Sequence, residues 1–123
     1  MSSRVSPRAI ATLGVAVGLS MASQAQAHAH LVSASPAENS ATSAPKLLAL
    51  HFSEKLEPAF SGVEITKADG GRVAIRSEVP ANDRKAIVGT VNGQLSPGVY
   101  RVQWHAVSAD SHRTQGAYTF TVR

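Results

Sequence analysis

The stretch that decides the fold is the longest alternating segment of the chain, Val99-Tyr100-Arg101-Val102-Gln103-Trp104-His105-Ala106-Val107. Its apolar side chains recur at every second position, with Tyr100, Val102, Trp104 and Ala106 on one face. Successive side chains of a strand point to opposite faces of a sheet, so this period predicts a strand buried on one side.

Segments on both sides of this stretch follow the same period. Asp69-Gly70-Gly71 is a turn signal that predicts a hairpin between residues 63–66 and 72–76. No pattern of helical period reaches three turns, and residues 53–60 hold one helical turn at most. Seven short segments are expected to be strands: residues 31–33, 48–53, 63–66, 72–76, 86–91, 99–107 and 116–123.

Seven short strands separated by turn signals predict an all-β, seven-stranded antiparallel Greek-key sandwich or barrel. The buried set should hold the apolar members of the alternating segments. These are Leu48, Leu50, Phe52, Val63, Ile65, Val73, Ile75, Val102, Trp104, Tyr118, Phe120 and Val122.

The first 27 residues are typical of a secretory signal peptide. Arg4 and Arg8 precede an uncharged apolar run, and Ala25-Gln26-Ala27 ends the segment as an A-x-A site. The apolar run is shorter than the ~20 residues that span a bilayer. We therefore expect cleavage after Ala27 and one exported domain at residues 28–123. A second A-x-A pattern, Ala27-His28-Ala29, leaves cleavage before His30 as an alternative.

Composition argues against nucleic-acid binding and against sulfur chemistry in the cleaved chain. Once Arg4 and Arg8 are removed, the rest of the 12 basic side chains scatter without forming a stripe. The chain has no cysteine, and its two methionines, Met1 and Met21, both belong to the predicted signal peptide. A domain without disulfides must be stabilised by packing or by a bound ion.

Histidines are the candidates for chemistry. His51 and His105 each stand opposite apolar neighbours in a predicted strand and are read as half-exposed polar residues. Asp110-Ser111-His112 follows the longest strand, and a spacing of two places both side chains on one side of an extended chain. A carboxylate beside an imidazole suits a divalent metal.

Cleavage after Ala27 would add a second pair of donors, the α-amine and imidazole of His28. One amine, two imidazoles and one carboxylate form a set that favours Cu(II), in the arrangement called a histidine brace. An N-terminus with histidine in third place also allows binding through the amine, backbone amides and His30. That mode suits a flexible peptide, and it remains an alternative.

Two groups of segments carry a resemblance to the CopC family of periplasmic copper-binding proteins. The N-terminal group comprises residues 28–38 and Leu50-His51-Phe52-Ser53-Glu54. The C-terminal group comprises residues 95–104 and Ser108-Ala109-Asp110-Ser111-His112 with Gly116 and Phe120.

The resemblance implies a cupredoxin-like or immunoglobulin-like β-barrel, a chain beginning at His28, and Cu(II) ligands at His28, Asp110 and His112. Some family members hold Cu(I) in a methionine-rich loop. The matching region, residues 66–80, has no methionine, which places this chain in a Cu(II)-only subgroup.

A periplasmic Cu(II) carrier or buffer in copper homeostasis or resistance is therefore the expected function. We expect a monomer that is not an enzyme, with an inner-membrane protein of the CopD type as the partner the family implies. The alternatives are a histidine-brace copper monooxygenase and a purely structural sandwich. Asp110 as a ligand disfavours the monooxygenase, and few aromatics remain outside the core pattern for a carbohydrate platform.

Overall fold

The computed structural model describes residues 28–123, so the predicted signal peptide lies outside the described residues. The only helix in the described range is one 3-10 turn, as expected, and no helix there could cross a membrane. The elements in chain order are β1 (Leu31–Ser35), β2 (Ala41–Thr42), β3 (Leu47–Phe52), η1 (Pro58–Phe60), β4 (Gly62–Lys67), β5 (Arg72–Val73), β6 (Ile75–Glu78), β7 (Ala86–Val91), β8 (Gly98–Val107) and β9 (Arg113–Val122).

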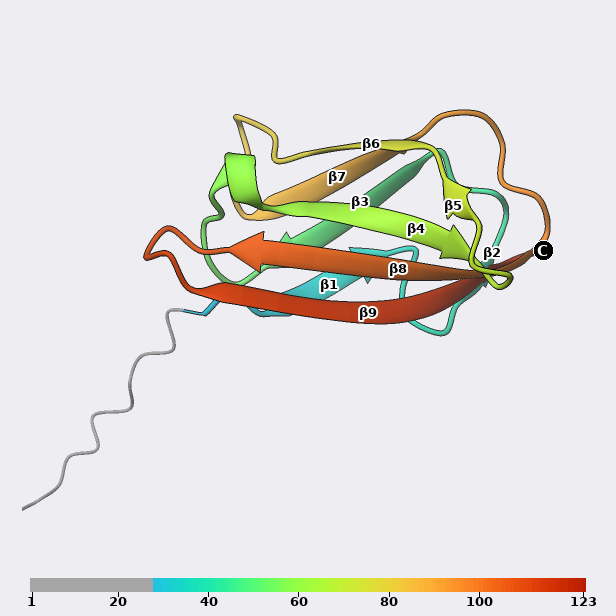
Figure 1. The fold of residues 1–123 in the computed structure, drawn as a ribbon, viewed down its shortest axis with the longest axis horizontal. Coiled ribbons are helices and arrows are strands. Elements are labelled where there is room, and N and C mark those ends of the chain that lie inside the picture. Colours follow the sequence, from blue (N-terminus) through green and yellow to red (C-terminus); the bar gives the residue numbers. More distant parts are fainter. Residues whose placement is uncertain (1–27) are drawn as a thin grey trace, which may run out of the picture.

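These strands form two sheets that pack face to face, so the all-β sandwich predicted from the alternation is confirmed (Figure 1). The four-stranded sheet has the order β1-β3-β7-β6, and the five-stranded sheet has the order β2-β9-β8-β4-β5. All pairings are antiparallel except that of β2 with β9.

The hairpin of β8 and β9 is the longest pairing, and it contains the stretch quoted from the sequence. It runs in unbroken register from the Gly98↔Val122 pair to the Val107↔Arg113 pair. The loop that joins the two strands, residues 108–112, therefore lies at one end of the sandwich. The first described residues reach the same end, because the carbonyl of Ala29 accepts a hydrogen bond from Thr114 near the start of β9.

The core forms where the inner faces of the two sheets meet. Nine of the twelve residues predicted to be buried are buried. Val73, Ile75 and Trp104 are partly buried and pack against the core from its margin. Alternation did not identify Ala29, Leu56, Ile87 and Leu95 as buried, and three of these precede or follow a strand rather than lying within one.

The predicted strand count of seven is wrong, because the described residues form nine strands. The segment predicted as one strand at residues 72–76 is broken at Ala74. On one side of the break β5 pairs with β4, and on the other β6 pairs with β7 in the opposite sheet. The chain thus passes from one sheet to the other at Ala74, although the alternation of apolar and polar residues continues through this point. The additional strand β2 has only two residues, too few to show a period.

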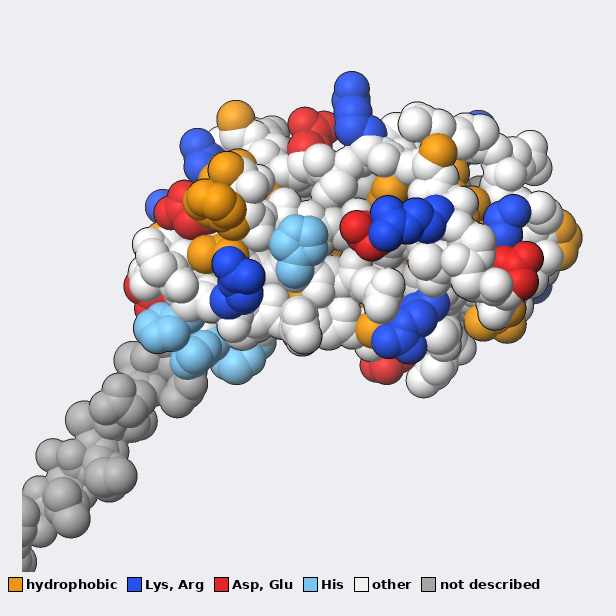
Figure 2. All heavy atoms as spheres, viewed as in Figure 1, with side chains coloured by type: hydrophobic (Ala, Val, Ile, Leu, Met, Phe, Trp, Pro, Cys, Tyr) orange, Lys and Arg blue, Asp and Glu red, His pale blue; other side chains and the backbone are white. Residues whose placement is uncertain are grey.

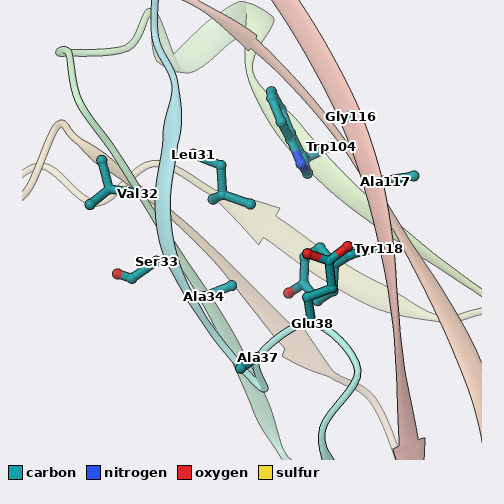
Figure 3. A pocket seen from close by; sticks show the side chains of 10 residues that line it. All are labelled: Leu31, Val32, Ser33, Ala34, Ala37, Glu38, Trp104, Gly116, Ala117 and Tyr118. Atoms are coloured by element: carbon teal, nitrogen blue, oxygen red, sulfur yellow. The ribbon is translucent and has the colours of Figure 1, made fainter.

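A groove of about 440 Å³ lies between β1 of one sheet and β9 of the other (Figure 3). Trp104 lines it and packs against Phe52 in a T-shaped arrangement, with ring centroids 5.1 Å apart. Gly116 faces the indole across the hairpin, and a Cβ there would come within 2.5 Å of Trp104 Cζ2. Tyr118 also lines the groove, and its buried hydroxyl has no hydrogen-bond partner among the described residues.

Candidate metal centre

The loop between β8 and β9 is a tight turn that its own backbone closes. The N–H of Ser108 donates to the carbonyl of His112 at 2.9 Å, and the N–H of Ser111 donates to the carbonyl of Ser108 at 2.8 Å. Ser111 has a φ of 75°, a left-handed conformation that few non-glycine residues adopt. Asp110 and His112 are thus brought together by a turn. The sequence argument that they share one side of an extended chain gave the right pairing for the wrong reason.

The carboxylate of Asp110 is oriented by hydrogen bonds to both of its oxygens. Oδ1 accepts from the hydroxyl of Ser108, which is 1% exposed, and from the backbone N–H of His112 at 3.2 Å. Oδ2 lies 2.8 Å from Nδ1 of His112. The hydrogen bond from Ser108 is the largest cause of a lowered pKa at Asp110. Together with His112, and against a smaller opposing effect of desolvation, it lowers that pKa to about 2.

His28 approaches the same loop from the N-terminal side. Its ring centroid lies 4.5 Å from that of His112, with the two ring planes tilted by 49°. Figure 2 shows histidine side chains gathered at the end of the sandwich where the described chain begins. All three side chains predicted from the sequence as metal ligands, His28, Asp110 and His112, are therefore neighbours in the fold.

The donor atoms present suit a divalent ion of the copper or zinc type. Donor atoms of protein metal sites lie about 2.0–2.2 Å from the ion, so two ligands at right angles are about 3 Å apart. Asp110 Oδ2 and His112 Nδ1, which are hydrogen-bonded at 2.8 Å, are close enough to bind one ion together. Within residues 28–123, however, no three His, Cys, Asp or Glu side chains already surround a common point. The amine donor at His28 exists only after cleavage.

Two of the remaining histidines, His51 and His105, lie away from this arrangement, whereas His30 stays next to His28. His51 is on the outer face of the four-stranded sheet, 3.9 Å from a carboxylate oxygen of Asp83. His105 is on the outer face of the five-stranded sheet, where its ring lies over Gly62. His30 is exposed, and its backbone N–H donates to Oγ of Ser53 at 2.9 Å.

Sequence reasoning missed the side chains that support the three candidate ligands. Ser108 orients Asp110, while Ser53 and Thr114 hydrogen-bond the backbone of residues 28–30. Serine and threonine are common in loops and strands, so nothing in their spacing marks these three. For Ser108, its place beside the Asp-x-His motif at the end of the longest strand was a usable signal.

Comparison with known proteins identifies the family. The CopC domain matches residues 31–123, nearly all of the described chain. The chain belongs to the CopC family. Copper resistance protein C of Xanthomonas campestris pv. juglandis is 41% identical over 124 residues, covering 94% of this chain and 97% of that protein. Protein YobA of Escherichia coli K12 is 40% identical over 99 residues, or 79% of this chain and 80% of that protein.

A solved CopC-family structure confirms the architecture. The crystal structure of PcoC, described as a methionine-rich copper resistance protein from Escherichia coli, superposes with a TM-score of 0.72 at 40% sequence identity. The match covers 78% of this chain and 99% of the PcoC chain. Copper transport protein CutJ of Bacillus subtilis is 34% identical over 98 residues, which are 78% of this chain but 18% of that longer protein. This chain thus belongs to a family of copper resistance and copper transport proteins.

Proposed function

We propose that the chain, once cleaved after Ala27, binds one Cu(II) ion through the α-amine and imidazole of His28, the carboxylate of Asp110 and the imidazole of His112. The observation that carries this proposal is the placement of the His28 ring 4.5 Å from the His112 ring, with Asp110 Oδ2 2.8 Å from His112 Nδ1. Amine, imidazole and carboxylate donors in this combination favour Cu(II).

The oxidation state follows from the donors that the domain lacks. Cu(I) prefers thiolate and thioether ligands, and residues 28–123 contain neither cysteine nor methionine. The relative PcoC is described as methionine rich, whereas this chain has no methionine after Met21. We therefore place the chain in the Cu(II)-only subgroup, and expect reduction to release the metal.

The site's exposure supports a role in carrying or buffering copper. Asp110 and His112 are both exposed at the end of the sandwich, where a second protein could reach the ion. We propose a monomeric periplasmic carrier or buffer in copper homeostasis or resistance, rather than an enzyme. Its partner is an inner-membrane protein of the CopD type. In CutJ, a similar segment is part of a much longer copper transport protein, which is consistent with delivery to a transporter.

The test is a Cu(II) titration of a chain that begins at His28, followed by electron paramagnetic resonance. One tightly bound ion with hyperfine coupling to three nitrogens is expected. His112→Ala and Asp110→Ala should weaken binding strongly, whereas the matched controls His51→Ala and His105→Ala should not. Reduction in the presence of a Cu(I) chelator should remove the metal. Retention of copper against that chelator, or a large loss of affinity in either control, would move the site elsewhere.

A further inference from the structure

The backbone of the first described residues is fastened to both sheets. The carbonyl of Ala29 accepts a hydrogen bond from Oγ1 of Thr114 at 2.9 Å. The N–H of His30 donates to Oγ of Ser53 at 2.9 Å, and the N–H of Ser53 donates to the carbonyl of His30 at 2.9 Å. Ala29 itself is 1% exposed and belongs to the core. Residues 29 and 30 are therefore fixed before the first strand begins.

The hydrogen bonds to residues 29 and 30 decide between two possible sets of metal ligands. One is the histidine brace, and the other is a set made of N-terminal backbone nitrogens and His30. A free N-terminus with histidine third can wrap around an ion through its amine, the backbone nitrogens of Ala29 and His30, and the His30 imidazole. That square-planar, all-nitrogen set accepts Ni(II) as well as Cu(II). It requires the His30 backbone nitrogen to face the ion. In the structure that nitrogen faces Ser53, and the carbonyl of the same peptide group, that of Ala29, is held by Thr114.

The two hydroxyls sit where they can link the N-terminus to the other ligands. Thr114 lies near the start of β9, two residues after His112 in the preceding loop, so neighbouring residues carry a candidate ligand and a contact to Ala29. Ser53 directly follows β3 and also lies within 3.5 Å of the His28 carbonyl oxygen. Both side chains are partly buried, which limits competition from water.

We propose that Ser53 and Thr114 are specificity-determining positioning residues. By holding the backbone of residues 29 and 30 against the sandwich, they keep the N-terminus facing Asp110 and His112. They thereby exclude the wrapped arrangement and the stable Ni(II) binding that it allows. This inference rests on the proposed function, because it concerns which of two ligand sets forms at the same N-terminus.

The test removes the two hydroxyls with little change in shape, through Ser53→Ala combined with Thr114→Val, in a chain that begins at His28. Thr119→Val is the matched control, because Thr119 is a partly buried threonine in the same strand and its side chain makes no hydrogen bond within residues 28–123. Each protein receives one equivalent of Cu(II) or Ni(II). The measurements are paramagnetic resonance, the visible d–d band and competition with a chelator. Circular dichroism checks the fold.

In the double variant, the Cu(II) spectrum should change to that of four nitrogen donors, with the d–d band at shorter wavelength. Ni(II) should bind as a diamagnetic square-planar complex at least tenfold more tightly than to the unmodified protein. Adding His30→Ala should then lower Cu(II) affinity at least tenfold, while the same change in the unmodified protein alters it less than about twofold. If the double variant melts too low, Thr114→Val alone should give the same changes in part.

Two results separate this inference from the proposed function beneath it. If the double variant keeps the original Cu(II) spectrum and remains insensitive to His30→Ala, the hydroxyls do not select the ligand set and the inference is wrong. If the unmodified protein already responds to His30→Ala and not to His112→Ala, the histidine brace itself is wrong.

Discussion

The buried hydroxyl of Ser108 donates a hydrogen bond to Oδ1 of the exposed Asp110 carboxylate, and so leaves Oδ2 facing His112. Oδ1 also accepts from the backbone N–H of His112, so both of its lone pairs are engaged and Oδ2 is the oxygen better placed to bind a metal. The geometry therefore favours a single carboxylate–metal bond over the two-oxygen binding common at calcium sites.

Removal of this hydroxyl should weaken copper binding without dismantling the fold. For Ser108→Ala we expect Cu(II) affinity to fall about 10–100-fold, the usual effect of losing a group that orients a metal ligand. The pKa of Asp110 should rise from about 2 toward its ordinary value, because the Ser108 hydrogen bond is the largest cause of its depression. Competition titration measures the first effect, and carboxyl NMR of the metal-free protein measures the second.

Ser61→Ala is the matched control for this substitution. Ser61 is also a buried serine, and its Oγ accepts from the N–H of Val107 at 3.0 Å, one residue before Ser108. Its loss removes a hydrogen bond of similar burial that does not touch Asp110. Equal copper affinities in the two variants would show that the Ser108 effect is one of general stability.

Acidification should release copper through its nitrogen donors, with Asp110 playing no part until the pH is very low. Metal ligands must be deprotonated, so protons compete with the ion. Free imidazoles and α-amines ionise at about 6.5 and about 7.7–8.0 in reference peptides. With a pKa of about 2, Asp110 stays charged throughout this range. Apparent Cu(II) affinity should fall steadily from neutral pH to pH ~5, and a titration that is flat over that range contradicts the nitrogen-rich ligand set.

Alkaline titration should reveal Tyr118 as an abnormally weak acid. Burial is the main cause that raises its pKa to about 12, and the charge of Glu38 adds to the effect. An unfolded tyrosine ionises at about 10. The folded state therefore keeps a proton that the unfolded state loses, so stability should decline as pH rises from about 10 to about 12. Absorbance titration of Tyr100→Phe, which leaves Tyr118 as the sole tyrosine, measures the value. A normal midpoint means that the phenol is exposed.

The margin of the core should be less sensitive to truncation than its centre. Large aromatic-to-alanine changes in full cores cost about 3–5 kcal/mol. Trp104 is only partly buried, so we expect Trp104→Ala to lower the free energy of unfolding by about 2–4 kcal/mol. Gly116→Ala should also destabilise the fold, because its Cβ would approach Trp104 Cζ2 to 2.5 Å. Denaturant melts measure both, and an unchanged melt for Trp104→Ala would mean that the indole contributes no packing.

Alternation predicted the sandwich because each long strand has one face in the core, as Leu48, Leu50 and Phe52 illustrate in β3. It could not predict that the chain changes sheets at Ala74, since the period of the side chains is the same on both sides of the crossing. The short strand β2 is defined by its pairing with β9 and not by a pattern of its own.

The sequence was enough to predict the candidate ligands, but not the hydroxyl groups and the turn that position them. Histidine and aspartate are uncommon enough for Asp110, His112 and His28 to stand out. Their approach depends on the left-handed turn at Ser111 and on hydroxyl contacts between residues far apart in sequence, such as Thr114 with Ala29. A hydroxyl can hydrogen-bond to water, to the backbone of its own turn or to a distant carbonyl, so only the folded chain shows which partner it has.

The strongest test of the proposed site concerns its first nitrogen. An amide nitrogen is a poor donor near neutral pH, so a chain extended before His28 by a single residue should lose the α-amine ligand and its chelate with the imidazole. The side chains of His28, Asp110 and His112 would be unchanged, and the core around Ala29 should hold as before. We expect the extended chain to keep its fold and its melting temperature without metal, and to bind Cu(II) several orders of magnitude more weakly.

Copper-dependent thermal stabilisation should disappear together with the affinity, because a ligand stabilises a protein only to the extent that it binds the native state. The measurement compares a chain starting at His28 with the same chain carrying one added glycine, by copper titration against a competing chelator and by thermal melts with and without Cu(II). A chain starting at His30 serves as a second control, because it keeps a terminal histidine but lacks the buried Ala29. Equal affinity in the His28 chain and the glycine-extended chain would falsify the brace and leave a site made of Asp110 and His112 side chains alone.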